Sequence, residues 1–562
     1  MKKHSFFLVL AAVLSLASIA PALSAQMAGR EDLAKKIDAV ISEVYKPDQP
    51  GAAIIVQKDG KTVFRSGYGM ADLELGVPIA PDMVFRLGSI TKQFTAVSIL
   101  MLAQEGKLGL QDEITKFLPD YPTQGRKITV EHLLTHTSGI QSYTDMPEWL
   151  PLWRKDFSVK ELIDLFKDKP MQFEPGERWA YNNSGYILLG AIIEKVSGES
   201  YEQFVDGHIF KPLGMKDSYY GNTERIIPRR IPGYQSGKSG FVNAPYLSMT
   251  QPYAAGSLIS TVDDLAIWSE AVFSGELVKK EWLDRAFTAY KLKNGESSGY
   301  GFGWFISDYQ GHRTIEHGGG INGFSAYEMA LPDDGIFLAI LTNSTIAARN
   351  PEPRAVTVAG LILGIPEPEG KPVSLAAKDI DPLAGVYVDD RKEERYITRE
   401  GGTLYSQRRG QGRYELVAES PTEFFFKDNL SRVRFIKDAA GAVTGLRVWA
   451  RYGPAQIYVK TDKPLPAPRK EVSVDPKIFD RYAGDYELNP GFTITILRRG
   501  DKLISQATGQ PEVELFPESE TRFFLKVVDA QVDFVKDESG RVTGLVLHQG
   551  GMDLPAKKTK AP

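Results

Sequence analysis

The last third of the chain is a duplication, in which the second copy follows the first at a constant offset of 99 residues. The matches at this offset include Gly385 with Gly484, Tyr387 with Tyr486, Phe424-Phe425 with Phe523-Phe524, and the Val-Thr-Gly-Leu stretch 443–446 with 542–545. Each copy consists of short alternating runs separated by glycine turns, with almost no helical periodicity. This pattern predicts two small antiparallel β-barrels, over residues 381–461 and 476–555.

Two proline-rich stretches separate these copies from each other and from the rest of the chain. Because such segments are extended and exposed, we predict linkers over residues 366–380 and 462–475. A chain of 562 residues is too long for a single core. The remaining residues, 26–365, therefore form one further and larger domain.

The N-terminus has the three-part layout of a secretory signal peptide. Two lysines precede an apolar run over residues 6–20, and small residues follow, with cleavage expected near Ser24 or Ala25. A membrane anchor is the alternative, but the run is short for a span. We expect a signal peptide over residues 1–25 and an exported protein, periplasmic where the cell has a periplasm, with no membrane association after cleavage.

Composition excludes several classes of function. The formal charge is −4, so the chain offers no basic surface for nucleic acid. The absence of cysteine excludes disulfides, thiolate metal sites and cysteine nucleophiles.

Two hairpin signals flank the part of residues 26–365 in which helical patterns dominate. Asp59-Gly60 and Asp334-Gly335 each separate two apolar runs, and such dipeptides are typical of tight hairpin turns. An antiparallel sheet built from both ends of this region, with helices inserted between, accounts for the order. The predicted fold class is therefore α+β.

A candidate nucleophile lies at the start of a predicted helix between the hairpins. Apolar residues at positions 90, 94, 97 and 101 have the spacing of one buried helix face. Ser89 and Lys92 are three residues apart, which places their side chains on the same face. Burial would lower the pKa of Lys92 and leave an amine able to take the serine proton. A solvated surface pair is the alternative for so common a spacing.

Two further stretches carry candidate site residues. Tyr181 and Asn183 lie two apart in a loop, where a phenol beside a lysine ammonium loses its proton more easily and an amide can bind a substrate amide. His317 precedes three glycines, and the N–H groups of such a run can form part of an oxyanion hole. Taken alone, the first stretch is better interpreted as a turn with a packed tyrosine, and the second as a flexible glycine turn with an incidental histidine.

In order and spacing, these three motifs closely resemble the serine β-lactamase and penicillin-binding-protein superfamily, in its branch of class C β-lactamases, DD-carboxypeptidases, D-aminopeptidases and carboxylesterases. The same resemblance extends to residues 133–139, 173–176, 212–215 and 255–261. It covers about residues 30 to 365. It implies an antiparallel sheet flanked by helices with an inserted helical subdomain, followed here by two lipocalin-like barrels.

The resemblance also implies a mechanism that needs no metal and no cofactor. Ser89 attacks a carbonyl and forms an acyl-enzyme, while Lys92 and Tyr181 share proton transfer. The backbone N–H groups of Ser89 and Gly320 hold the oxyanion, and water releases the acyl group. The expected substrate is a small molecule or a short peptide.

Asn183, His317 and Gly319 are the substrate-binding positions that the resemblance implies. His317 stands where β-lactamases and carboxypeptidases carry lysine, and an ordinary histidine is mostly neutral at neutral pH. We therefore expect weak recognition of a C-terminal carboxylate. This favours cleavage of small peptides, amides or esters, as in D-aminopeptidases and esterases, over DD-carboxypeptidase or β-lactamase activity, which stays as an alternative.

Three other interpretations are open or excluded. A non-catalytic receptor for cell-wall peptides is the alternative from another class of protein. The barrels can mediate homo-oligomerisation, as in related peptidases, or reach towards the active site, as in the D-aminopeptidase layout.

His132 and His136 have the spacing of a zinc peptidase motif, but Leu133 stands where that motif needs its glutamate. We therefore do not expect a zinc site there.

Overall fold

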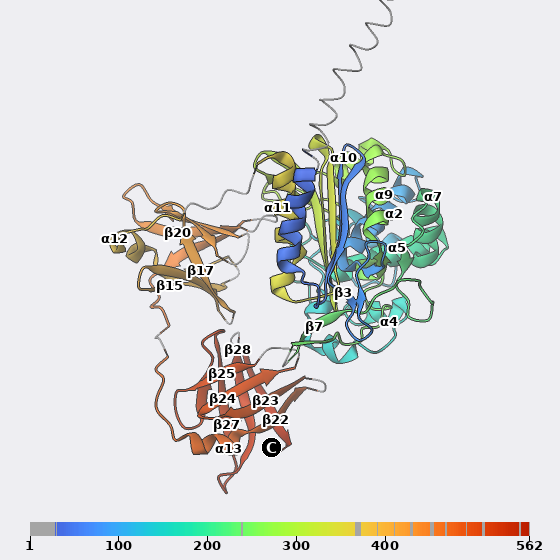
Figure 1. The fold of residues 1–562 in the computed structure, drawn as a ribbon. Coiled ribbons are helices and arrows are strands. Elements are labelled where there is room, and N and C mark those ends of the chain that lie inside the picture. Colours follow the sequence, from blue (N-terminus) through green and yellow to red (C-terminus); the bar gives the residue numbers. More distant parts are fainter. Residues whose placement is uncertain are drawn as a thin grey trace, which may run out of the picture.

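The computed structural model describes residues 29, 31–237 and 240–365, and the two C-terminal copies over residues 372–560 apart from gaps at 391, 410, 428–430, 450–454, 467–468, 490–491, 509–511 and 550–551. The predicted signal peptide, residues 1–25, and parts of both predicted linkers, 366–371 and 467–468, lie outside the described residues. Figure 1 shows an N-terminal domain of helices around a sheet, followed by two barrels in orange and red.

The N-terminal domain is built on a six-stranded antiparallel sheet. In spatial order its strands are β10 (Phe305–Tyr309), β11 (His312–Ile321), β12 (Phe324–Leu331), β13 (Ile336–Thr342), β1 (Ala52–Lys58) and β2 (Lys61–Tyr68). The two ends of the domain meet where β1 pairs with β13, as the two hairpin signals predict. Asp59 and Gly60 have φ angles of 51° and 70°, the left-handed pair that joins twisted strands in a two-residue turn.

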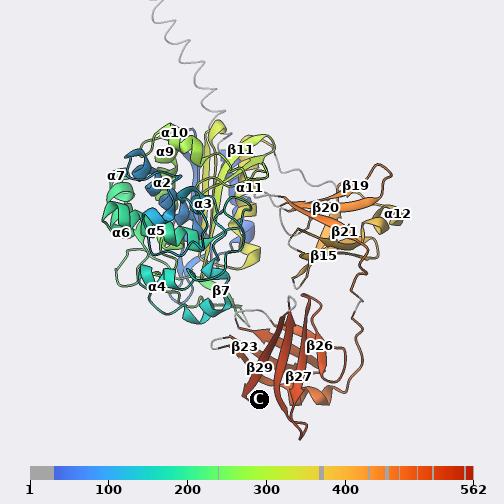
Figure 2. The same cartoon turned by 180° about the vertical axis from the view of Figure 1, so that it is seen from behind.

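Helices cover both faces of this sheet, as Figures 1 and 2 show from opposite sides. Ile54 and Val56 of β1 pack in one core with the helix over residues 31–44 and with α11 (Pro351–Leu363). The alternate residues Ala53 and Ile55 belong to a second, larger core. Alternation of this kind is expected in a strand that is covered on both faces.

The larger core is formed by most of the helices of the domain. These helices are α2 (Thr91–Gln104), α3 (Val130–Leu134), α4 (Val159–Asp164), α5 (Asn183–Ser197), α6 (Tyr201–Val205), α7 (Lys211–Leu213), α8 (Tyr253–Gly256), α9 (Val262–Ser274) and α10 (Lys280–Ala286). The short strands around them are β3 (Met70–Asp72), β4 (Val77–Pro78), β5 (Phe85–Arg86), β6 (Tyr219–Tyr220), β7 (Tyr234–Gly237), β8 (Gly240–Asn243) and β9 (Leu258–Ser260).

Helix α2 runs through the middle of this core. The sequence pattern predicts one buried face, but every residue of α2 except Met101 and Gln104 is buried. The helix contacts α5 and α8, and its polar residues are paired inside the core. Thr95 Oγ1 lies 2.7 Å from Ala254 O, and Ser98 Oγ lies 2.7 Å from Phe94 O. Because small hydroxyl groups can be satisfied in this way, they do not mark a solvent-facing side.

The two copies fold as two closed eight-stranded antiparallel barrels, as predicted. Barrel 1 follows the short helix α12 (Ala377–Ile380) and consists of β14 (Gly385–Val388), β15 (Glu394–Glu400), β16 (Thr403–Arg408), β17 (Arg413–Ala418), β18 (Glu423–Phe426), β19 (Arg432–Lys437), β20 (Val443–Trp449) and β21 (Gln456–Thr461). Barrel 2 follows α13 (Phe479–Tyr482) and consists of β22 (Gly484–Asn489), β23 (Phe492–Arg499), β24 (Lys502–Ala507), β25 (Val513–Pro517), β26 (Arg522–Phe524), β27 (Ala530–Lys536), β28 (Val542–Gln549) and β29 (Met552–Lys560).

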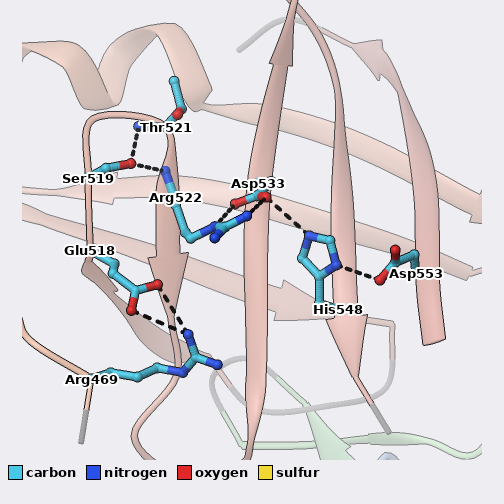
Figure 3. A network of polar contacts seen from close by, with 8 residues as sticks. All are labelled: Arg469, Glu518, Ser519, Thr521, Arg522, Asp533, His548 and Asp553. Atoms are coloured by element: carbon cyan, nitrogen blue, oxygen red, sulfur yellow. Dashed lines mark hydrogen bonds and ion pairs between the residues drawn. The ribbon is translucent and has the colours of Figure 1, made fainter. Parts of the chain in front are cut away.

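A chain of polar contacts links four consecutive strands on barrel 2 (Figure 3). Arg522 Nε lies 2.6 Å from Asp533 Oδ1, and His548 bridges Asp533 and Asp553 through its two ring nitrogens. Arg522 and Asp553 are largely exposed, so the network adds specificity to the strand pairing more than stability. In the part of the chain that the structure describes, no group of three or more metal-ligating side chains is close enough to hold a metal ion. None of the described helices combines the length and apolarity needed to span a bilayer.

Candidate active site

Ser89 lies in a short 3-10 turn, η1 (Gly88–Ile90), which continues directly into α2. Lys92 lies in the first turn of α2 and is fully buried. Its Nζ is 3.1 Å from Ser89 Oγ. The fold therefore holds the hydroxyl and the amine side by side, at the distance of a hydrogen bond.

Two carbonyl oxygens complete the surroundings of the Lys92 amine. Its Nζ is 2.8 Å from Asn183 Oδ1 and 2.8 Å from Ala255 O. Burial lowers the pKa of Lys92 well below its usual value, and no carboxylate among the described residues opposes this shift. A neutral amine fits this arrangement, because two N–H groups donate to the carbonyl oxygens and the lone pair can face the Ser89 O–H.

Tyr181 reaches the same point from the loop that precedes α5. Its ring centroid is 4.8 Å from Lys92 Nζ. Burial raises the pKa of the Tyr181 phenol, and the Ser89 hydroxyl opposes that rise. The phenolic oxygen is buried, and no described atom meets hydrogen-bond geometry with it. From the sequence, a lysine ammonium is expected to favour the phenolate form of Tyr181. In the structure, burial favours the neutral form of both Lys92 and Tyr181.

Asn182 and Asn183 have separate structural tasks at the start of α5. Asn182 is the N-cap, and its Oδ1 accepts from Gly185 N at 2.8 Å. Asparagine is among the residues most favoured at an N-cap, because its side-chain oxygen can accept from a free N–H group of the first turn. Asn183 accepts from Lys92 and donates to Thr144 Oγ1 at 3.0 Å. Its amide is thus engaged with the protein, and it holds the amine in place.

The glycines of β11 allow this strand to approach the nucleophile turn. Gly88 has a φ of 54°, and a Cβ there would lie 2.9 Å from Gly320 N. A Cβ on Gly319 would lie 1.9 Å from Leu87 O. Ser89, Gly319 and Gly320 consequently line one cavity of about 440 Å³, together with Tyr181 and His317. Lys92 and Asn183 do not line this cavity. Lys92 contacts the nucleophile from within the core, and Asn183 contacts Lys92.

His317 is held as a neutral ring. It is buried, its Nδ1 lies 2.6 Å from the Gly318 carbonyl oxygen, and its Nε2 lies 3.0 Å from the Tyr300 hydroxyl. A carbonyl can only accept, so Nδ1 carries the proton and Nε2 accepts from Tyr300. Burial lowers the pKa of His317 to about 3. The position that is a lysine cation in β-lactamases is therefore uncharged here.

An aromatic cluster that the sequence analysis does not identify surrounds these groups. The His136 ring centroid lies 4.4 Å from that of Tyr181 and 4.6 Å from that of Tyr300, and Trp179 packs beside both tyrosines. His136 Nδ1 accepts from the backbone N–H of Asn182 at 3.1 Å, which fixes the loop that carries Tyr181. The sequence marks His136 through the resemblance of residues 133–139 and through its spacing to His132, while nothing in the sequence marks Tyr300.

Comparison with known proteins identifies relatives of both parts of the chain. A family model described as "Beta-lactamase" matches residues 33–361, and one described as "Domain of unknown function (DUF3471)" matches residues 468–559. Penicillin-binding protein 4* of Bacillus subtilis (strain 168) is 26% identical over 552 residues, which is 94% of this chain and 100% of the relative.

Two solved structures share the fold. The octameric penicillin-binding protein homologue from Pyrococcus abyssi superposes with a TM-score of 0.55 at 28% identity, over 76% of this chain and 99% of the other. The D-amino acid amidase from Ochrobactrum anthropi SV3, solved with L-phenylalanine amide, superposes with a TM-score of 0.53 at 26% identity, over 59% of this chain and 99% of the other.

Proposed function

This chain belongs to the beta-lactamase family of serine hydrolases, and on that premise we propose that it cleaves small amides, peptides or esters through an acyl-enzyme on Ser89. The observation that carries the proposal is the Lys92 amine, which is buried, has two carbonyl acceptors and lies 3.1 Å from the Ser89 hydroxyl. An amine held neutral in this way is a base of suitable strength for a serine hydroxyl.

The proton movements follow from the positions of these groups. The Ser89 proton passes to Lys92 Nζ as Oγ attacks the substrate carbonyl carbon. The resulting oxyanion faces the backbone N–H groups of Ser89 and Gly320, each worth about 3 kcal/mol in related sites. Tyr181 donates its O–H to the leaving nitrogen or oxygen and regains a proton from the Lys92 ammonium. Attack of water on the acyl-enzyme by the reverse proton route then releases the acid.

The neutral His317 supports amides and esters over substrates that carry a carboxylate next to the scissile bond. A carboxylate placed there would meet no cation from this ring, because the pKa of His317 is about 3. The structural likeness to a D-amino acid amidase agrees with amide cleavage. DD-carboxypeptidase or β-lactamase activity is the second candidate, favoured by the likeness to Penicillin-binding protein 4*.

The test is a substrate panel with the wild type and Ser89→Ala. We expect the wild type to turn over D-phenylalanine amide and nitrophenyl acetate faster than nitrocefin, and Ser89→Ala to lose about a thousandfold or more. Ser98→Ala is the matched control, since it removes a hydroxyl of α2 that is bonded to Phe94 O and lies outside the cavity. Full turnover by Ser89→Ala would refute the proposal, and fast nitrocefin turnover would favour the second candidate.

Mass spectrometry of the protein after incubation with substrate decides between an enzyme and a receptor. An acyl adduct on Ser89 that forms and decays is expected of the hydrolase. An adduct that never decays would indicate a receptor for cell-wall peptides.

Export and assembly are also part of the proposal. The N-terminal pattern supports export, and the N-terminus of the secreted protein should lie just after Ser24 or Ala25. The octameric state of the Pyrococcus abyssi homologue supports a homo-oligomer, which light scattering of the full chain would detect.

A further inference from the structure

The two barrels differ at one pair of interior positions. In barrel 1, Arg395 of β15 lies directly opposite Arg408 of β16. In barrel 2, the corresponding pair is Ile494 of β23 opposite Ala507 of β24, and both belong to the apolar interior. The fold therefore accepts an apolar pair here, so the two arginines of barrel 1 are not required for closing a barrel.

The guanidinium of Arg395 is buried with only neutral hydrogen-bond partners. Its side chain is 6% exposed. Nη1 donates to Ser406 Oγ at 2.8 Å and Nη2 to the Tyr458 hydroxyl at 3.3 Å. Its Nε is buried without a partner among the residues described. Asp389 acts on this cation through space, but no hydrogen bond between them is seen. A buried donor without an acceptor is costly unless a ligand satisfies it.

Arg408 adds a second cation at the same end of the barrel. Its Nη2 forms an ion pair with Glu393 at 2.6 Å. Its Nε, like that of Arg395, is buried and has no partner in the described part of the chain. Among the described residues, Glu393 is the carboxylate bonded directly to this pair of guanidinium groups, and Asp389 acts on both cations through space. The planar donor pairs of such groups match the two oxygens of a carboxylate.

Both arginines line a cavity of about 1470 Å³ that is shared with the N-terminal domain. Phe426 and Val448 of barrel 1 give it apolar walls, and Tyr181 belongs to its lining as well as to that of the nucleophile cavity. The space is large enough for a short peptide. An apolar wall next to the cations favours an organic acid over a free inorganic anion.

We propose that barrel 1 binds the carboxylate of a peptide ligand between Arg395 and Arg408. Where the proposed hydrolase function holds, this carboxylate is the far end of a substrate or product whose reacting end lies near Tyr181. The neutral His317 cannot supply recognition of negative charge beside the nucleophile, and the barrel supplies it at a distance from the scissile bond.

Binding is measured in the full-length Ser89→Ala variant, so that the result does not depend on turnover. The probes are N-acetyl-D-phenylalanyl-glycyl-D-alanine and its C-terminal amide, titrated by calorimetry. We expect the acid to bind at least tenfold more tightly than the amide. Equal affinity for the two probes would overturn the proposal. Inorganic phosphate that binds as tightly as the acid would assign a free-anion site and would overturn it too.

Variants locate the charge recognition. Arg395→Ile with Arg408→Ala copies the pair of barrel 2, and it should weaken binding of the acid at least tenfold while leaving binding of the amide unchanged. Arg408→Ala alone should give part of this loss and guards against misfolding of the double variant. Arg409→Ala is the matched control, because Arg409 is adjacent, exposed and outside the cavity lining. An equal loss for acid and amide, or a loss in Arg409→Ala, would refute the assignment.

The two proposals fail in distinguishable ways. If the Ser89→Ala variant does not bind the acid more tightly than the amide, only the barrel proposal is refuted. If the wild type hydrolyses neither amides nor esters, only the catalytic proposal is refuted.

Discussion

Glu328 provides a quantitative test of how burial controls charge around this site. It lies on β12 opposite His317 of β11 and is 5% exposed. Its Oε1 accepts from Gln93 Nε2, whereas its Oε2 is buried with no hydrogen-bond partner among the described residues. Burial raises the pKa of Glu328 from 4.5 to about 7, and the hydrogen bond from Gln93 opposes the rise.

The raised pKa sets both the sign and the size of the effect on stability. Well below pH 4.5 the carboxyl is protonated in the folded and the unfolded state, so it has no pH-dependent effect. As the pH rises from about 4 to 7 the unfolded state ionises first, and the folded state loses stability relative to it. A difference of about 2.5 pH units amounts to a loss of about 3 kcal/mol above pH 8.

Glu328→Gln keeps the shape and the acceptor for Gln93 but cannot ionise. Relative to the wild type, the variant should therefore gain about 2.5 kcal/mol between pH 5 and pH 8. Its amide nitrogen introduces a buried donor, which costs about 1–3 kcal/mol at every pH. The quantity to compare is therefore how the difference in unfolding free energy between variant and wild type changes with pH, and not its absolute value.

Urea unfolding followed by tryptophan fluorescence measures this change. Six of the seven tryptophans lie within residues 33–361, so the signal reports chiefly on the N-terminal domain. Glu328→Met is the second variant, since it also cannot ionise and should show the same pH dependence with another offset. A difference between wild type and variant that is the same at pH 5 and pH 8 would refute the reasoning.

Three smaller perturbations test the geometry of the site. Gly319→Ala should abolish D-phenylalanine amide turnover and cost more than about 2 kcal/mol of stability, because its Cβ would lie 1.9 Å from Leu87 O. A Cβ on Gly320 would have no atom within 4 Å, so Gly320→Ala should keep both turnover and stability in the same assays and thermal melts. Equal losses in the two variants would contradict this reasoning. Asn182→Ala should cost about 1 kcal/mol in urea unfolding through loss of the cap, and Asn182→Ser should recover most of it; an unchanged Asn182→Ala would disprove the role. Since the pKa of His317 is about 3, His317→Asn should leave the acid limb of the kcat/KM profile at the same pH, and a displaced limb would make His317 the titrating group.

The sequence predicts most of the architecture because its strongest signals are local. Asp59-Gly60 fixes a hairpin through left-handed backbone angles, and the 99-residue repeat requires two similar domains. The burial of α2 does not depend on local sequence alone. Its apolar spacing suggests one buried face, but Thr95 and Ser98 find partners inside the core, and only the packing of α5 and α8 shows that every side is covered.

The candidate site likewise has features that the sequence predicts and features that depend on packing. Ser89, Lys92 and Tyr181 come together in the structure, as their motifs predict. The lowered pKa of Lys92 is also predicted, because burial of the helix implies it. The raised pKa of Tyr181 is not, because it depends on how many atoms surround the phenol. Tyr300, which orients His317, has no sequence motif at all, since its position is set by the loop before β10 and not by spacing from another site residue.

Burial has one consequence that connects the catalytic chemistry with the choice of substrate. Lys92, Tyr181 and His317 each carry a pKa shift that favours the neutral form. A site of neutral groups generates charge only during the reaction, at the oxyanion and at the Lys92 amine, where hydrogen-bond donors and acceptors are already in place. Such a site has little means of selecting a charged substrate in its ground state. Selection by charge then has to come from groups outside the nucleophile cavity, and the two arginines of barrel 1 are cations that line the adjoining space.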